Sequence, residues 1–129
     1  MLLDKVFLDN LSKLASENPR LRTSFDLRNS DKDNSQRMLN ALQPGTKIPV
    51  HRHPATAETL IVIRGSVCHR LYDGNGEVID MFVLKAGGEC SVAQIPAGQF
   101  HSLECLEADT VIFEAKDGSY MPVPFEDIL

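Results

Sequence analysis

The stretch of sequence that decides the fold is GTKIPVHRHPATAETLIVIRG, residues 45–65. It places His51 and His53 two positions apart, a spacing that directs both side chains to the same face of an extended strand. Glu58 follows after a turn that contains Pro54, so its carboxylate can return to the same place. Two imidazoles and a carboxylate in this arrangement indicate a metal site.

A second stretch, PAGQFH at residues 96–101, supplies a third histidine. Its Pro-Gly turn leads into a new strand that has His101 near its start. Three neutral imidazoles and one carboxylate suit zinc, iron, manganese, nickel or copper, and they leave coordination positions open for water or substrate. The sequence therefore predicts one divalent metal ion bound by His51, His53, Glu58 and His101, without identifying the metal.

The pattern of residue types after Ser35 predicts an all-β fold. Short runs of β-branched and aliphatic residues alternate with turn residues such as Pro44-Gly45 and Gly87-Gly88. Eight such strands predict an antiparallel sandwich or barrel. The expected strands cover residues 36–42, 47–53, 59–63, 66–72, 78–84, 89–95, 101–105 and 110–115.

The first 35 residues have a different character. Residues 4–17 predict a short amphipathic helix, because apolar side chains recur there at intervals of three and four. The polar segment 20–35 predicts an irregular or partly extended connection. The chain of 129 residues suits one domain, in which we expect residues 1–35 to pack on a barrel formed by residues 36–129.

Composition narrows the range of partners and compartments. A net charge of -5 argues against nucleic acid as a partner. No apolar run approaches the ~20 residues of a membrane span, and the first residues lack the basic start of a signal peptide, so we expect a cytoplasmic protein that does not contact membranes. Three cysteines, Cys68, Cys90 and Cys105, are an odd and sparse set, which favours reduced thiols over disulfides.

Charge is distributed unevenly along the chain. Residues 18–70 hold nine Lys or Arg against four Asp or Glu, whereas residues 71–129 hold two against eleven. Three interpretations stay open: a basic rim for an anionic ligand, complementary surfaces of two subunits, or an ordinary solvated surface. The first places four arginines near the barrel rim, namely Arg20, Arg22, Arg28 and Arg37.

Both histidine motifs resemble the signature of the cupin superfamily. The first agrees at every fixed position and the second supplies its Pro, Gly and His. Two departures lie in the second motif, where seven residues instead of five separate Gly88 from Pro96, and Cys105 stands where cupins usually have Asn. The resemblance implies a cupin jelly-roll β-barrel with a short N-terminal α-helix, and sheet edges that often pair in homodimers.

A more specific resemblance covers most of residues 20–120. The segments QRMLNAL (36–42), PGT (44–46), HRH (51–53) and FEAKDG (113–118) are similar to WbuC-type cupin-fold metalloproteins. Those proteins are associated with bacterial surface-polysaccharide (O-antigen) gene clusters. The resemblance implies a role with a sugar or nucleotide sugar in polysaccharide biosynthesis, without naming a reaction.

Polar residues on two strands are candidates for contact with substrate or support of the metal ligands. Gln36 and Asn40 share one face of their strand, and inside a barrel each needs a hydrogen-bond partner. Glu114 and Lys116 share a face of the last strand, where a pair near the barrel and a solvated edge are equally open interpretations.

Three further residues complete the candidate set. Cys105 has the parity of His101 and is expected to face the barrel interior, with packing favoured over reactivity. Tyr120 follows the last strand and is a candidate to cover the barrel mouth. His69 belongs to no motif, and we expect it at the surface.

The predicted ligands serve three classes of function equally well. One is a metal enzyme acting on a sugar or sugar nucleotide, such as an isomerase or epimerase. The second is a metal-dependent small-molecule dioxygenase, and the third is a non-catalytic carbohydrate-binding or sensing module. No independent catalytic acid or base stands out in the sequence, so it does not separate enzyme from binding module.

Overall fold

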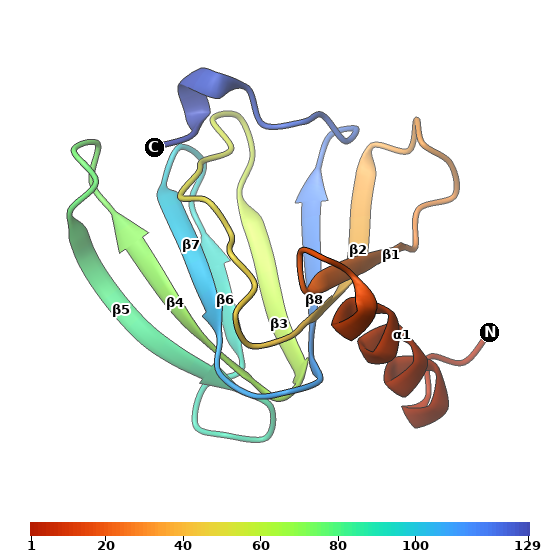
Figure 1. The fold of residues 1–129 in the computed structure, drawn as a ribbon. Coiled ribbons are helices and arrows are strands. Elements are labelled where there is room, and N and C mark those ends of the chain that lie inside the picture. Colours follow the sequence, from red (N-terminus) through yellow and green to blue (C-terminus); the bar gives the residue numbers. More distant parts are fainter.

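The computed structural model describes residues 1–129 and has two antiparallel sheets face to face, with one helix on the outside (Figure 1). One sheet has five strands in the order β1-β2-β8-β3-β6, and the other has three in the order β5-β4-β7. This jelly-roll arrangement confirms the predicted fold class. The elements are α1 (Lys5–Glu17), β1 (Arg22–Asp26), β2 (Ser35–Leu42), β3 (Glu58–Arg64), β4 (Ser66–Tyr72), β5 (Val78–Lys85), β6 (Val92–Ile95), β7 (Phe100–Cys105), β8 (Thr110–Asp117) and the 3-10 helix η1 (Phe125–Asp127).

Helix α1 is capped by Asp4, whose carboxylate accepts a hydrogen bond from the backbone N–H of Phe7 at 3.0 Å. Its buried face covers the outer face of the five-stranded sheet beside β1, β2 and β8. The helix and the sheet form an apolar cluster there, which consists of Leu8, Leu11, Ala15, Leu39, Ala41 and Val111. The helix falls short of the length and apolar character that crossing a membrane requires.

One expected strand is absent, and one strand was not foreseen. Residues 47–53 form no strand: His51 alone makes isolated bridges, to His101 and to Ile128. Pro49 within this segment and Pro54 directly after it lack the N–H that a continuous ladder needs. Residues 20–35, expected to form an irregular or partly extended connection, contain the regular strand β1, which pairs antiparallel with β2. Its sequence RTSFD has too little apolar alternation to reveal a strand whose partner stabilises it.

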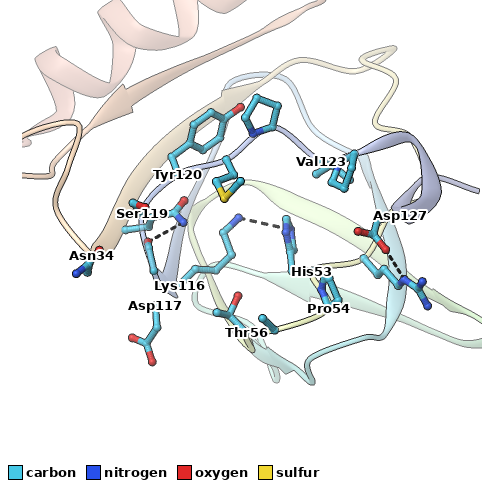
Figure 2. A pocket seen from close by; sticks show the side chains of 17 residues that line it. Asn34, His53, Pro54, Thr56, Lys116, Asp117, Ser119, Tyr120, Val123 and Asp127 are labelled. Carbon is cyan, nitrogen blue, oxygen red and sulfur yellow. Dashed lines mark hydrogen bonds and ion pairs between the residues drawn. The ribbon is translucent and has the colours of Figure 1, made fainter.

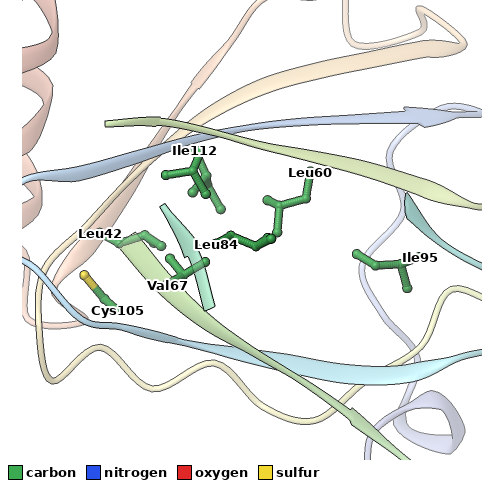
Figure 3. Packing of buried hydrophobic residues seen from close by; sticks show 8 residues of the cluster. Leu42, Leu60, Val67, Leu84, Ile95, Cys105 and Ile112 are labelled. Carbon is green, nitrogen blue, oxygen red and sulfur yellow. The ribbon is translucent and has the colours of Figure 1, made fainter. Parts of the chain in front are cut away.

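The space between the sheets at one end of the barrel is filled by apolar side chains (Figure 3). Leu60 and Leu84 are fully buried there, and burial of such a side chain stabilises the fold by roughly 1.5–3 kcal/mol. We call this set the apolar end; its members are Leu42, Leu60, Val62, Val67, Leu84, Ile95, Cys105 and Ile112.

The turn between β3 and β4 closes this end and depends on glycine. Gly65 has a φ of +79°, and a Cβ at this position would overlap the side-chain hydroxyl of Thr110. Thr110 is itself fully buried and donates to the carbonyl of Glu107 at 2.8 Å. Any side chain at position 65 would therefore displace the start of β8.

The opposite end of the barrel is crossed by the C-terminal segment, which runs from β8 over the strand ends to η1 (Figure 1). The side chain of Arg52 donates to Asp127 at 2.7 Å, and the backbone N–H of Arg52 donates to the carbonyl of Asp127 at 3.0 Å. The N–H of Leu129 donates to the carbonyl of Val50 at 2.9 Å. These bonds attach the end of the chain to the histidine-bearing loop.

Candidate metal centre

Backbone pairing brings the two histidine motifs together. The N–H of His51 donates to the carbonyl of His101 at 3.0 Å, and the N–H of His101 donates back at 2.8 Å. His53 lies two residues further along the loop, and Glu58 is the first residue of β3. The segment containing Pro54 therefore returns the chain to the same end of the barrel, as the spacing predicted.

The four side chains converge on one position. One ring nitrogen from each of His51, His53 and His101 lies within 4.8 Å of the others. Oε2 of Glu58 lies 3.3 Å from Nε2 of His53 and 3.6 Å from Nε2 of His101. These are three nitrogen donors and one oxygen donor around a space that a single ion would fill.

Hydrogen bonds at the far side of two rings fix which nitrogen is free. Nδ1 of His51 lies 2.9 Å from the carbonyl of Pro49, and Nδ1 of His101 lies 2.8 Å from the carbonyl of Gln99. A carbonyl oxygen only accepts, so each Nδ1 carries the proton and each Nε2 of the neutral ring presents a lone pair. Burial, the main cause, lowers the pKa of His51 to about 4, which keeps that ring neutral.

Glu58 shows that a cation fits here. Its Oε2 is buried and has no hydrogen-bond partner. Burial by itself would raise the pKa of Glu58, but the rings of His101 and His53 and the charge of Lys116 bring that pKa below its usual range. An ionised oxygen facing imidazole lone pairs is costly unless a cation lies between them. A divalent metal bound there would polarise a carbonyl or hydroxyl oxygen or activate water.

Two residues of β8 lie beside the centre without forming the pair considered from the sequence. Nζ of Lys116 lies 3.5 Å from Nε2 of His53 and 3.9 Å from Oε2 of Glu58. Glu114 instead accepts from Nδ2 of Asn40 at 3.1 Å. Burial and the neighbouring Glu58 carboxylate raise the pKa of Glu114 well above its usual value. Asn40 thus has the partner that its inward position requires.

Gln36 and Tyr120 mark the open end of the barrel. Gln36 is buried and its Nε2 donates to the carbonyl of Gly118 at 3.0 Å. This bond attaches the start of the C-terminal segment to β2. Tyr120 is 59% exposed and lines the mouth without closing it.

The three cysteines have separate environments and form no disulfide. Cys105 belongs to the apolar end, and its Sγ donates to the carbonyl of Glu107 at 3.1 Å. Burial raises its pKa, which favours the protonated thiol and agrees with its packed position. Cys68 is also buried, whereas Cys90 is exposed.

The prediction of a surface position for His69 was wrong. His69 is fully buried, between Phe82 at a ring-centroid distance of 5.1 Å and His101 at 5.8 Å, with nearly parallel planes. Neither ring nitrogen has a partner, and burial lowers its pKa to about 4. The signal was present in the sequence, because His69 alternates with Val67 and Leu71 on the inward face of its strand.

Two cavities meet at the candidate centre. An inner cavity of about 300 Å³ contains His51, Asn40 and Glu114 in its wall. An outer cavity of about 590 Å³ lies between the histidine loop and the C-terminal segment (Figure 2). The two cavities adjoin, because they share five lining residues, namely Gln36, His53, Lys116, Tyr120 and Val123.

The arginines expected at the rim are only partly there. Arg28 pairs with Asp26 at 2.7 Å and Arg37 with Asp33 at 3.4 Å, and neither lines a cavity. Arg22 lines the inner cavity and donates to the carbonyl of Lys47 at 2.8 Å. The charge asymmetry therefore does not translate into a basic rim.

Residues 3–84 match the profile of a protein family described as "Domain of unknown function (DUF6016)". A search of curated proteins gives no match.

Solved structures with a similar fold include CapF in complex with 3-isopropenyl-tropolone (TM-score 0.65, 22% identity, 77% of this chain and 28% of CapF). Oxalate oxidase in complex with glycolate has a TM-score of 0.65 and 16% identity over 85% of this chain and 57% of that one. KdgF from Halomonas sp. has a TM-score of 0.62 and 14% identity over 80% of this chain and 84% of KdgF. This chain thus spans less than two thirds of the length of CapF and of oxalate oxidase. These are cupin-fold proteins, and the fold of this chain is a cupin fold.

Proposed function

We propose that this chain, which belongs to the family described as a domain of unknown function (DUF6016), acts through one bound metal ion. His51, His53, Glu58 and His101 are the proposed ligands. The protein would bind or act on a sugar or nucleotide sugar in bacterial surface-polysaccharide biosynthesis. The observation that carries the metal is the buried, unpartnered Oε2 of Glu58 among imidazole nitrogens.

The sugar rests on the lining of the cavities and on the resemblance to WbuC-type proteins. Side-chain amides and hydroxyls surround the outer cavity together with small apolar groups, which suits a ligand with many hydroxyls. A volume of about 590 Å³ accommodates at least a monosaccharide beside the metal.

Titration calorimetry of metal-loaded protein tests this proposal directly. The ligands are nucleotide sugars and matched neutral sugars, and the control is protein stripped of metal. Binding that requires metal supports the proposal. If no sugar binds while the metal content is about one ion per chain, the sugar is wrong and the metal assignment stands.

A matched pair of variants tests the ligand set itself. Glu58→Gln removes the charge of the proposed ligand and should weaken metal binding by at least about tenfold. Glu114→Gln changes the neighbouring carboxyl in the same way while keeping an oxygen that can accept from Asn40. If both variants lose metal equally, Glu58 has no special role.

A metal-dependent small-molecule dioxygenase is the alternative function. One structural neighbour, oxalate oxidase, is an oxidase with a similar fold. Dioxygen chemistry needs a redox metal with open coordination positions. Iron whose spectrum changes on addition of a substrate would favour this alternative, whereas zinc in the purified protein would argue against it.

We also propose a homodimer, formed through the free edge of β5. This strand is one of the two edge strands of the three-stranded sheet, and it exposes Ile79, Met81 and Val83 on one face, each more than half accessible. A long apolar edge strand is a template for pairing with a second copy. Sedimentation analysis should give a dimer for the native chain and a monomer for Met81→Asp; a native monomer would contradict the proposal.

A further inference from the structure

We infer that the ligand of the proposed metal centre is an organic acid of about monosaccharide size, whose carboxylate lies between the metal and Nζ of Lys116. This inference deepens the proposed function and rests on it for the metal. It names the charged group that the ligand carries and the side chain that recognises that group.

The position of Lys116 is the first step. Its side chain is only 16% exposed, and its ion pair with Oε2 of Glu58 is long, 3.9 Å, which is beyond hydrogen-bond distance. Its closest polar neighbour is Nε2 of His53 at 3.5 Å, and Figure 2 shows the ammonium group directed at that ring. These two long contacts stabilise a largely buried ammonium only weakly, so a closer anionic partner would be favourable.

Metal binding would occupy both atoms that Lys116 now contacts. Nε2 of His53 and Oε2 of Glu58 are two of the proposed ligand atoms, and neither can neutralise the ammonium fully while coordinating an ion. The strand register holds Lys116 directly opposite Glu58, so it cannot move far from the centre. An anionic oxygen is the group that would restore a partner to Lys116.

The charges of the interior point the same way. A divalent ion and Lys116 together carry more positive charge than Glu58 and Glu114 carry negative charge, even if both carboxyls are ionised. Arg28 and Arg37 do not add a phosphate site, because they are paired with aspartates away from the cavities. Arg22, in the wall of the inner cavity, already donates to the hydroxyl of Thr46 and the carbonyl of Lys47. One metal and one ammonium present two attachment points, which match the two oxygens of a carboxylate better than the three of a phosphate.

The shape of the space sets the size of the remainder. Lys116 lines both cavities, so an acid group held at its Nζ stands where the inner and outer spaces join. The outer cavity offers Asn34, Thr56 and Ser119 as hydrogen-bonding groups without a second unpaired cation. Arg52, the other cation in its wall, is bound to Asp127. The body of the ligand is therefore neutral and hydroxyl-bearing.

Calorimetry with matched ligands tests the inference. The probes are glucuronate and galacturonate, the corresponding neutral hexoses, the hexose phosphates, and glycerate as a short hydroxy acid. Metal-loaded protein should bind at least one of the acids about tenfold or more tightly than its neutral counterpart. Lys116→Met should abolish that preference without changing the weak binding of neutral sugars, and it should leave the metal content equal or higher.

A matched control and a second readout accompany this titration. Lys85→Met removes a lysine that pairs with Glu107 on the surface, and it should keep the preference for acids. Protein loaded with Co²⁺ should change its visible absorption when the acid binds, because a carboxylate oxygen joins the coordination sphere. A preference for acids that survives Lys116→Met, or tighter binding of hexose phosphates than of acids, would overturn the inference.

Failure of the proposed function has a different signature. If no sugar of any kind binds, glycerate decides the anchor: binding that depends on both metal and Lys116 keeps the carboxylate site without the sugar. Absence of glycerate binding as well overturns the carboxylate site. Absence of metal from the native protein rejects the metal centre before any of these titrations.

Discussion

The two ends of the barrel interior are built from the same strands, yet one end is packed and the other is polar. On β3, Glu58 lies at the open end and Leu60 two residues further in. On β7, His101 lies at the open end, and Cys105, four residues further along the same face, packs at the apolar end. Alternate residues of one strand share the inward face, so the same face carries proposed metal ligands at one end and packed apolar side chains at the other.

The two ends contribute differently to the stability of the fold. The apolar end has close-packed aliphatic side chains and no unsatisfied polar atom, whereas the open end has orphaned nitrogen and oxygen atoms on His69 and Glu58. Burial of apolar area supplies the folding free energy, and a fold of this size has enough of it to carry a costly site. Changes at the two ends should therefore separate metal affinity from stability.

The largest effect should follow loss of a ligand at the open end. His101→Ala should weaken metal binding by more than about 100-fold, because even loss of a residue that only orients a ligand costs about 10- to 100-fold. Competition against a chelator of known affinity measures the change. Retention of metal at native affinity would break the comparison at this end.

At the apolar end, Leu60→Ala should lower the free energy of unfolding by about 2–5 kcal/mol, since it opens a cavity in a fully buried position. Urea unfolding of metal-free protein gives this value. The metal content of the folded variant should stay at the native level. Loss of metal together with stability would mean that the two ends are coupled.

Acid sensitivity should come from the open end as well. The folded-state pKa values of His69 and His51 are lowered to about 4 by burial, from an ordinary value of 6.5. Below 6.5 the unfolded chain binds protons that the folded chain excludes, so stability is lost as the pH falls from about 6.5 to 4. The loss at pH 5 should be on the order of 1–2 kcal/mol for each histidine.

His69→Leu separates the two contributions. The variant should remove about half of this pH dependence in chelator-treated protein, and stability at pH 7.5 should be equal or higher, because two unpartnered buried nitrogens disappear. Urea unfolding at pH 7.5 and pH 5 measures both quantities. An unchanged slope with pH would show that His69 is not buried in neutral form.

The smallest effect should be that of chelation on the fold. Removal of metal at neutral pH should leave the β-rich circular dichroism spectrum intact. The melting temperature should fall only by the amount that corresponds to the lost binding free energy. Unfolding at room temperature on chelation would show that the apolar end does not suffice.

Much of this arrangement was predictable from local patterns. The spacing of His51, His53 and Glu58 and the turn before His101 carry strong local signals, and the structure brings all four together. β1 was not predictable in this way, because its stability depends on pairing with β2 rather than on its own composition.

The environment of single residues was harder to predict. The burial of His69 follows from which face of the sheet is inward, a property set by register with neighbouring strands. The role of Lys116 depends on lying opposite Glu58 across β3 and β8, which the sequence separates by 58 positions. Arg28 and Arg37 illustrate the reverse. Each belongs to a stretch of excess positive charge in the sequence, yet each forms an ion pair with a nearby aspartate in the structure.

The central claim is that the open end holds one metal ion, and elemental analysis tests it most directly. Native protein purified without added metal should contain about one divalent ion per chain, and the same preparation of His51→Ala or His53→Ala should contain a small fraction of that amount. Native protein without metal after equilibration with zinc, iron and manganese, or variants with the native content, would contradict the account.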